Sequence, residues 1–218
     1  MTRRRLRAAL VAAAFILLAP AAARGAPPSV VAPHAILLQP QTGDVILRKA
    51  PDAERPVAST TKLMTALLVL ERAKLGDMFT AVPYQAQAAE SRINLKAGER
   101  MSVRDLLRAL LLESANDAAA TLAVGVSGSQ DAFVGEMNAR ARELGLRHTA
   151  YANPIGLDEP GNHSSARDLV KLTRRLRTNA FFRRTVAMRS ASLTTGDHVR
   201  QIDNTNDCLL YTSPSPRD

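Results

Sequence analysis

Two residues near position 60 have the types and spacing of a serine nucleophile and its lysine base. In "VASTTKLM", Ser59 and Lys62 lie three apart, so a helix beginning at Ser59 puts the ammonium stem beside the hydroxyl. A serine hydroxyl needs a base, and lysine serves only when burial or nearby positive charge lowers its pKa. A helix N-terminus favours both an oxyanion at Ser59 and an uncharged lysine. An isolated match is equally typical of an N-cap serine followed by an exposed lysine.

A second polar group interrupts an apolar, helix-forming region further along the chain. "LLESANDAA" places Ser114 and Asn116 in a short break between two apolar helical stretches. A Ser-x-Asn loop at such a break can offer a hydroxyl and a carboxamide to a cleft. Either side chain can instead cap a helix, so this stretch alone leaves both readings open.

Composition argues against several classes of function. The chain has no tryptophan and only 4% aromatic residues, which disfavours a stacking platform for single-stranded nucleic acid. The net charge is +9, but four arginines lie in the first seven residues. The remaining surplus is typical of a solvated surface, with attraction to an anionic envelope as the alternative. We expect no nucleic-acid partner. The histidines show no metal-ligand spacing, and we expect no metal or cofactor; they are His34, His148, His163 and His198.

The first 23 residues have the pattern of a secretory signal peptide. "MTRRRLR" is a positively charged start, "AALVAAAFILLA" an apolar stretch too short for a comfortable membrane span, and "AAA" at 21–23 a cleavage signature. We expect cleavage after Ala23, a linker over 24–32 and an exported protein; a retained anchor is the alternative. The only cysteine is Cys208, so no disulfide framework is available.

Periodicity predicts a hairpin near the start and helices through the middle of the chain. "HAILLQPQTGDVILRK" reads as two β-rich runs around a turn. A helix is expected from Ser59 to about Gly76. Further helices are expected after the capping boxes "SVRD" and "SARD", from "DAAATLAV" to Gly125–Gly128, and over Gln130–Leu144. "YANPIGLDEPGNH" is expected to be a loop, and "SASLTTGDHVRQI" a strand pair or loop.

Taken in order, the two motifs resemble those of the penicillin-recognising serine enzymes, whose set is Ser-x-x-Lys, Ser-x-Asn and Lys-Thr-Gly. The stretches "ASTTKLMTALLVLE", "ESRINLKAGERMSVRDLLRALLLESANDAA", "GSQDAFVGEMNARARELGLRHTAYANPIGLDEPGNHSSARDL" and "QIDNTND" look like the low-molecular-mass D-alanyl-D-alanine carboxypeptidases. The resemblance covers roughly 33–206. It implies an α+β fold of the β-lactamase and penicillin-binding transpeptidase type, here the first hairpin and the helical subdomain of a partial catalytic domain.

The resemblance also implies roles for the site residues. Ser59 would be the acylated nucleophile, Lys62 its general base, Ser114 a proton relay and Asn116 a ligand of the substrate backbone. The substrate would be a peptidoglycan stem peptide ending in D-Ala-D-Ala, and β-lactams would acylate Ser59. The protein would act in the periplasm or cell envelope, at the outer face of the cytoplasmic membrane; membrane association through a C-terminal anchor outside this chain stays open.

Two other functions compete with this one. A class A β-lactamase would need a deacylating glutamate in a Glu-x-x-Leu-Asn pattern, and the candidate loop has Glu159 without that pattern. A non-catalytic, secreted cell-wall-binding module would never be acylated at Ser59. Penicillin separates the three, because it would give a stable adduct, rapid turnover or no adduct.

The family's third motif does not occur in the 218 residues, which contain no Lys-Thr-Gly. In the family that strand grips the substrate carboxylate and supplies one oxyanion-hole amide. The loss of one such donor costs on the order of 10²–10³ in rate. The later strands of the family's sheet are missing too, and a lone hairpin is marginal in water. We therefore predict that the chain as given folds poorly and has little or no carboxypeptidase activity; robust release of D-alanine by residues 24–218 would contradict this.

The end of the chain differs from everything before it. "QIDNTN" fits the carboxypeptidase pattern, whereas "CLLYTSPSPRD" does not. That string can be encoded by the adapter of a transposase-based sequencing library read in frame. We therefore interpret 207–218 as a non-native tail; a natural disordered C-terminus is the alternative.

Overall fold

The structure is a computed structural model that describes residues 29–87, 89–207 and 209. The predicted signal peptide lies outside these residues, as do most of the predicted tail and part of the predicted linker. Within the described part, no helix is both long and apolar enough to cross a membrane.

Along the chain, pairs of short antiparallel strands come before, within and after a largely helical middle. The strands are β1 (Ala35–Leu38), β2 (Val45–Lys49), β3 (Met78–Thr80), β4 (Arg100–Ser102), β5 (Ser190–Leu193) and β6 (Arg200–Asp203). The α-helices are α2 (Lys62–Arg72), α3 (Val103–Arg108), α4 (Asn116–Ser127), α5 (Gln130–Glu143), α6 (Ala166–Leu176) and α7 (Ala180–Val186). A 3-10 helix, η1 (Ala58–Thr61), precedes α2, and a π-helix, η2 (Ala109–Glu113), continues α3.

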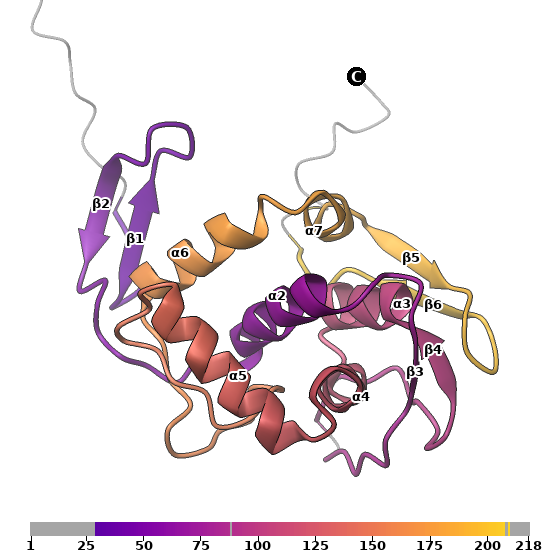
Figure 1. Ribbon diagram of the computed structural model, residues 1–218. Helices are drawn as coiled ribbons and strands as arrows, with labels where there is room; N and C mark the ends of the chain where they lie inside the picture. Colours follow the sequence, from indigo (N-terminus) through magenta and orange to yellow (C-terminus); the bar gives the residue numbers. More distant parts are fainter. Residues whose placement is uncertain (1–28, 88, 208, 210–218) are drawn as a thin grey trace, which may run out of the picture.

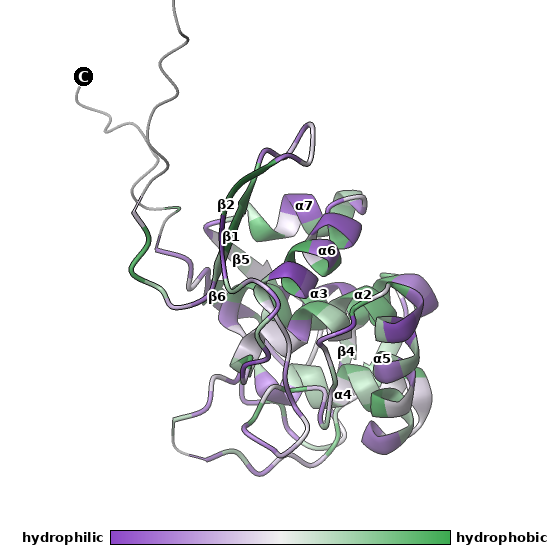
Figure 2. Ribbon diagram, turned by 90° about the vertical axis from the view of Figure 1, so that its left-hand side faces the viewer, coloured by the Kyte–Doolittle hydropathy of each residue, from purple (hydrophilic) through white to green (hydrophobic). Residues whose placement is uncertain are grey.

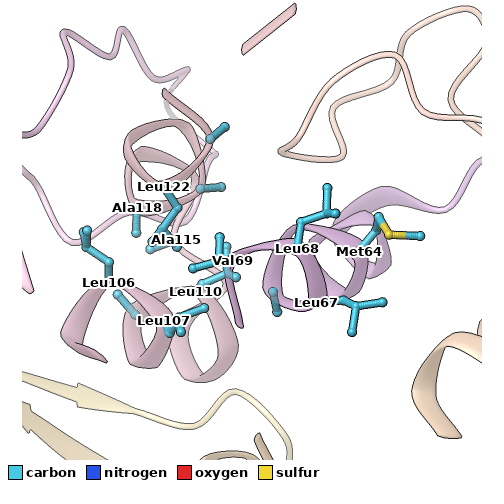
Figure 3. Close-up of a cluster of buried hydrophobic side chains, with 14 of the residues drawn as sticks. Met64, Leu67, Leu68, Val69, Leu106, Leu107, Leu110, Ala115, Ala118 and Leu122 are labelled. Atoms are coloured by element: carbon cyan, nitrogen blue, oxygen red, sulfur yellow. The ribbon is translucent and has the colours of Figure 1, made fainter. Parts of the chain in front are cut away.

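Helix α2 lies at the centre of the molecule, and α4, α5 and α6 contact it (Figure 1). Figure 3 shows Val69 of α2 next to Leu110 of η2 and Ala115, the residue before α4, whereas Met64, Leu67 and Leu68 point to other sides of α2. Burial of one such side chain contributes about 1.5–3 kcal/mol, so this cluster holds the helical layer together. Its labelled members are Met64, Leu67, Leu68, Val69, Leu106, Leu107, Leu110, Ala115, Ala118 and Leu122, all buried.

In the part of the chain that the structure describes, the strands form three two-stranded antiparallel sheets: β1 with β2, β3 with β4, and β5 with β6. The first hairpin was expected and is confirmed, with a register irregularity between Leu37 and Leu38. The expectation for 190–202 left a strand pair or loop open, and the structure has the strand pair. The β3–β4 pair was not predicted. The α+β fold class is confirmed.

The helix starts follow the sequence closely, and their ends less so. Ser102 and Ser165 accept hydrogen bonds from the backbone amides of Asp105 and Asp168, which confirms the serine half of both predicted capping boxes. The helix expected from Ser59 to Gly76 is wrong at both ends, because a 3-10 turn precedes α2 and the helix ends at Arg72. Helix α7 was not predicted.

The β1–β2 hairpin leaves apolar surface uncovered. It projects beside α6, and apolar residues make up all of β1 and the first three residues of β2 (Figure 2). Leu37, Val45 and Ile46 are 41%, 45% and 51% exposed. A groove of about 690 Å³ lies between the hairpin and α6, lined by Leu38, Pro40, Leu169, Val170, Arg174, Arg177 and Arg183 among others.

Candidate active site

Ser59 lies in the 3-10 turn η1, immediately before α2. Its hydroxyl is exposed and caps neither helix, so it does not serve as the N-cap that an isolated motif would suggest. Ala58, the residue before it, has φ 41°, a left-handed conformation that costs a non-glycine residue on the order of 1 kcal/mol. The turn therefore presents the hydroxyl at the surface on a strained backbone, which is common at functional sites.

Lys62 reaches back from the first position of α2 to this hydroxyl. Its Nζ donates to Ser59 Oγ over 3.2 Å and to the carbonyl oxygen of Ile155 over 2.6 Å. Lys62 is only 4% exposed, which rules out the exposed lysine of the alternative reading. Burial lowers its pKa to about 8, although the charge of Glu90 opposes that shift. A buried lysine whose pKa lies near neutrality can take a proton from the hydroxyl it touches.

The loop over 153–157 holds this pair in place. Besides Ile155, the carbonyl oxygen of Pro154 accepts a hydrogen bond from Thr65 Oγ1 over 2.7 Å, which ties the loop to the first turn of α2. Gly156 has φ +92°, and a Cβ there would lie 2.0 Å from the carbonyl oxygen of Ala58. Only glycine fits this approach. The sequence showed these residues as a loop and gave no role to Ile155 or Gly156; the glycine in "NPIG" was the one available signal.

Ser114 lies at a sharp turn between η2 and α4. Its φ of 60° is left-handed, and its backbone N–H bonds to the carbonyl oxygen of Ala109, five residues back. Its Oγ is buried and has no hydrogen-bond partner among the described residues. The capping reading of Ser114 is therefore wrong, and its hydroxyl is one of the few buried polar groups that call for an explanation.

Asn116 begins α4 and is held on two sides. Its backbone N–H donates to the carbonyl oxygen of Ser91 over 2.8 Å, and its Nδ2 donates to Glu90 Oε2 over 2.9 Å. No side chain caps α4, whose N-cap is Ala115. The capping reading of Asn116 is therefore wrong as well. Glu90 connects the two motifs, because its carboxylate binds Asn116 and its charge acts on Lys62.

The described residues contain no group of three or more histidine, cysteine, aspartate or glutamate side chains arranged to hold a metal ion. Two of the histidines flank one carboxylate: His148 Nδ1 and His163 Nε2 lie 3.5 and 3.7 Å from the oxygens of Glu54. Glu159, the glutamate of the β-lactamase alternative, accepts a hydrogen bond from Asn153 Nδ2 over 3.0 Å inside its own loop.

A serine with a buried lysine three residues later, together with a Ser-x-Asn turn between apolar helices, defines the class of penicillin-recognising serine enzymes. The D-alanyl-D-alanine carboxypeptidase family matches residues 21–215. The chain belongs to this family.

Individual relatives agree with that assignment. Over 150 residues the chain is 37% identical to the D-alanyl-D-alanine carboxypeptidase DacF of Bacillus subtilis, covering 66% of this chain and 39% of that protein. The crystal structure of a D-alanyl-D-alanine carboxypeptidase from Mycobacterium tuberculosis superposes with a TM-score of 0.80 and 32% identity, over 88% of this chain and 73% of that one. The crystal structure of the Streptomyces K15 DD-transpeptidase superposes with a TM-score of 0.77 and 29% identity, over 87% of this chain and 79% of that one. These neighbours confirm the penicillin-binding fold, while the chain spans 39% of the DacF relative's length and 40% of a second relative, DacC of Escherichia coli.

Proposed function

We propose that this chain carries the acylation centre of a serine-type D-Ala-D-Ala carboxypeptidase. The observation that carries the proposal is the contact of 3.2 Å between Lys62 Nζ and Ser59 Oγ, made by a lysine that is 4% exposed. Such a pair needs no metal to form an acyl-enzyme. Membership of the carboxypeptidase family supports the substrate class, a peptidoglycan stem peptide ending in D-Ala-D-Ala.

The proposed reaction has two halves. In the first, neutral Lys62 takes the hydroxyl proton while Ser59 Oγ bonds to the carbonyl carbon of the penultimate D-alanine. The C–N bond to the terminal D-alanine then breaks, and the leaving amine takes a proton from Lys62 through the Ser114 hydroxyl. In the second half, water gives a proton to Lys62 and attacks the ester, which releases the trimmed peptide and restores Ser59.

β-Lactams are proposed to acylate the same hydroxyl, because their strained amide presents a carbonyl carbon to the same attack. We also propose that the protein works outside the cytoplasm, at the outer face of the cytoplasmic membrane. The signal-peptide pattern of the first 23 residues and the location of peptidoglycan support this.

Intact-protein mass spectrometry with benzylpenicillin tests the proposal. A stable adduct that maps to Ser59 and is lost in Ser59→Ala is the expected result. Rapid turnover without a lasting adduct would favour the β-lactamase, and no adduct on a chain shown to be folded by circular dichroism would favour the non-catalytic module. Release of D-alanine from a D-Ala-D-Ala peptide is measured in parallel; little release is expected from a chain without Lys-Thr-Gly.

A further inference from the structure

Glu90 lies on the irregular segment between β3 and β4 and is bound through both carboxylate oxygens. Oε2 accepts from Asn116 Nδ2 over 2.9 Å and also from the hydroxyl of Tyr84. Oε1 accepts from the backbone N–H of Gln87 over 3.0 Å. Three donors from three positions therefore fix one carboxylate against the carboxamide of the second motif.

An ionised carboxylate can only accept hydrogen bonds, which determines how the carboxamide must lie. The NH₂ group of Asn116 has to face Glu90, where one of its two hydrogens is used. This orientation turns the carbonyl oxygen of the carboxamide away from Glu90, so that it can accept a hydrogen bond from a substrate. A neutral partner such as glutamine could donate as well as accept and would stabilise either orientation.

We infer that Glu90 is a positioning residue, held by Tyr84, that sets the orientation of the Asn116 carboxamide for substrate binding. This inference rests on the proposed function, since Asn116 matters only if the site binds a peptide or a β-lactam. The bond is charge-assisted, and such bonds are about twice as strong as neutral ones.

Glu90 does not have the surroundings of a catalytic base. Hydrogen bonds from Tyr84 and Asn116 lower the pKa of its carboxyl group below the usual value, which makes it a weak proton acceptor. Burial and the bond to Glu90 raise the pKa of Tyr84 to about 12, so the phenol stays protonated and keeps donating. Both groups are thus held in the states that the network needs at neutral pH.

The contact is also not needed to attach the segment to α4. The backbone N–H of Asn116 already donates to the Ser91 carbonyl oxygen. Asp117 accepts from the backbone amides of Ile93 and Leu95 over 3.2 and 2.9 Å. These bonds fix the backbones, whereas the Glu90 bond acts on the side chain of Asn116.

The test compares Glu90→Ala and Glu90→Gln with the control Glu143→Gln, which makes the same chemical change at a side chain that is 63% exposed on α5. The first readout is the ¹H–¹⁵N signal pair of the Asn116 carboxamide in the full chain, assigned by its loss in Asn116→Asp. The hydrogen bonded to Glu90 is expected downfield of its partner in the wild type and in the control. In Glu90→Gln this signal should move upfield, because a neutral acceptor makes a weaker bond. In Glu90→Ala the signal should no longer lie downfield of its partner.

The second readout is acylation by a fluorescent penicillin, counted per acylable site. The penicillin concentration for half-maximal rate should rise about tenfold in Glu90→Ala, as expected for a lost bond to a charged group, with the limiting rate within about threefold. A merely structural role would lower the number of acylable sites and leave that concentration unchanged. Unchanged Asn116 signals in Glu90→Ala would overturn the inference. If the wild type forms no adduct, the proposed function fails, while the carboxamide signals still decide the orientation.

Discussion

Lys62 is buried, and its Nζ donates to Ser59, three residues away in the sequence, and to the carbonyl oxygen of Ile155, 93 residues away. Burial in this position disfavours the ammonium form, and the nearby Glu90 charge partly restores it. The balance leaves a lysine that changes protonation close to physiological pH. Reactivity at Ser59 should therefore follow the titration of a single neighbouring amine.

The first prediction is that acylation of Ser59 by penicillin rises with pH, is half-maximal near pH 8 and levels off above about pH 9. The pKa of Lys62 is lowered to about 8, and only the neutral amine can take the serine proton, so the rate increases as pH rises through that value. Between pH 7 and 9 the neutral fraction grows about tenfold. Stopped-flow measurement with a fluorescent penicillin checks this, with Ser59→Ala as the blank; a rate still climbing steeply at pH 10 would point to an ordinary lysine.

The second prediction concerns Ser114→Ala. The Ser114 hydroxyl is buried and has no hydrogen-bond partner among the residues that the structure describes, so its removal should change the free energy of unfolding by less than about 0.5 kcal/mol. If the hydroxyl relays a proton, acylation should slow by about 10²-fold. Thermal unfolding and acylation rates are measured on the same preparation. A large loss of stability with normal acylation per folded molecule would show that the hydroxyl is structural.

The sequence predicted those site contacts that are made between residues close together in the chain. Ser59 and Lys62 meet because three positions of a helical turn bring them together, and the spacing alone indicated this. Glu90 and Ile155 reach their partners across 26 and 93 residues, and no local pattern encodes such contacts. The roles assigned to Ser59, Lys62, Ser114 and Asn116 stay predictions until the variants are measured.

Among the secondary-structure elements, the site is built from the turn η1, the loop over 153–157 and the first residues of α2 and α4. The 153–157 loop supplies carbonyl oxygens to α2 and packs its glycine against η1. Local signals found the helix starts, since Ser102 and Ser165 cap the amides three residues on. They missed β3 and β4, which are three residues each and pair across an irregular segment. Pairing at that separation depends on tertiary contacts.

The third prediction compares Gly156→Ala with Gly161→Ala. Both glycines have left-handed φ, +92° and +91°, but a Cβ would meet the Ala58 carbonyl oxygen at 2.0 Å only in the first case. Gly161→Ala should cost about 1 kcal/mol from the backbone alone, and Gly156→Ala distinctly more. Acylation should fall only in Gly156→Ala, because the loop must leave η1. Urea unfolding and penicillin labelling of both variants provide the check; equal behaviour would mean that the close approach has no role.

At the scale of the whole molecule, one buried ion pair ties the last hairpin to the middle of the chain. Arg200 on β6 donates to both oxygens of Glu99 over 2.7 and 2.8 Å, and the two side chains are 7% and 0% exposed. Burial alone would raise the pKa of Glu99. The bonds from Arg200 and from the backbone amides of Asp197 and Lys96 outweigh it and lower that pKa to about 2.

The fourth prediction follows from the sign of that shift. The pKa of Glu99 is lower in the folded chain than its ordinary 4.5, so its stabilisation is full above about pH 5 and is lost as pH falls toward 2. Glu99→Gln should lower the free energy of unfolding at pH 7 by about 3 kcal/mol. The difference from the wild type should shrink at pH 3. Urea unfolding at both pH values tests this, with Glu143→Gln as the control; a difference independent of pH would contradict it.

The overall architecture was predictable in class but not in detail. The α+β class and the helical layer follow from periodicity and from the family resemblance. The number of hairpins does not follow from either, because hairpins depend on contacts between distant residues. Glu99 and Arg200, whose ion pair holds β6 in place, are 101 residues apart. The prediction that the chain folds poorly and lacks carboxypeptidase activity is untested. The buried cluster around α2 favours a folded chain, whereas the exposed apolar residues of the β1–β2 hairpin favour poor folding.

The position of Ser114 depends on the number of residues in the π-helix η2. It spans Ala109–Glu113 and delivers Ser114 into its left-handed turn with a bond to Ala109, five residues back instead of four. Each residue of an α-helix turns the chain by about 100°. Deletion of one residue from η2 would restore ordinary helical spacing and swing Ser114 about that far around the axis. Single-codon deletions within η2 should therefore abolish acylation by a fluorescent penicillin.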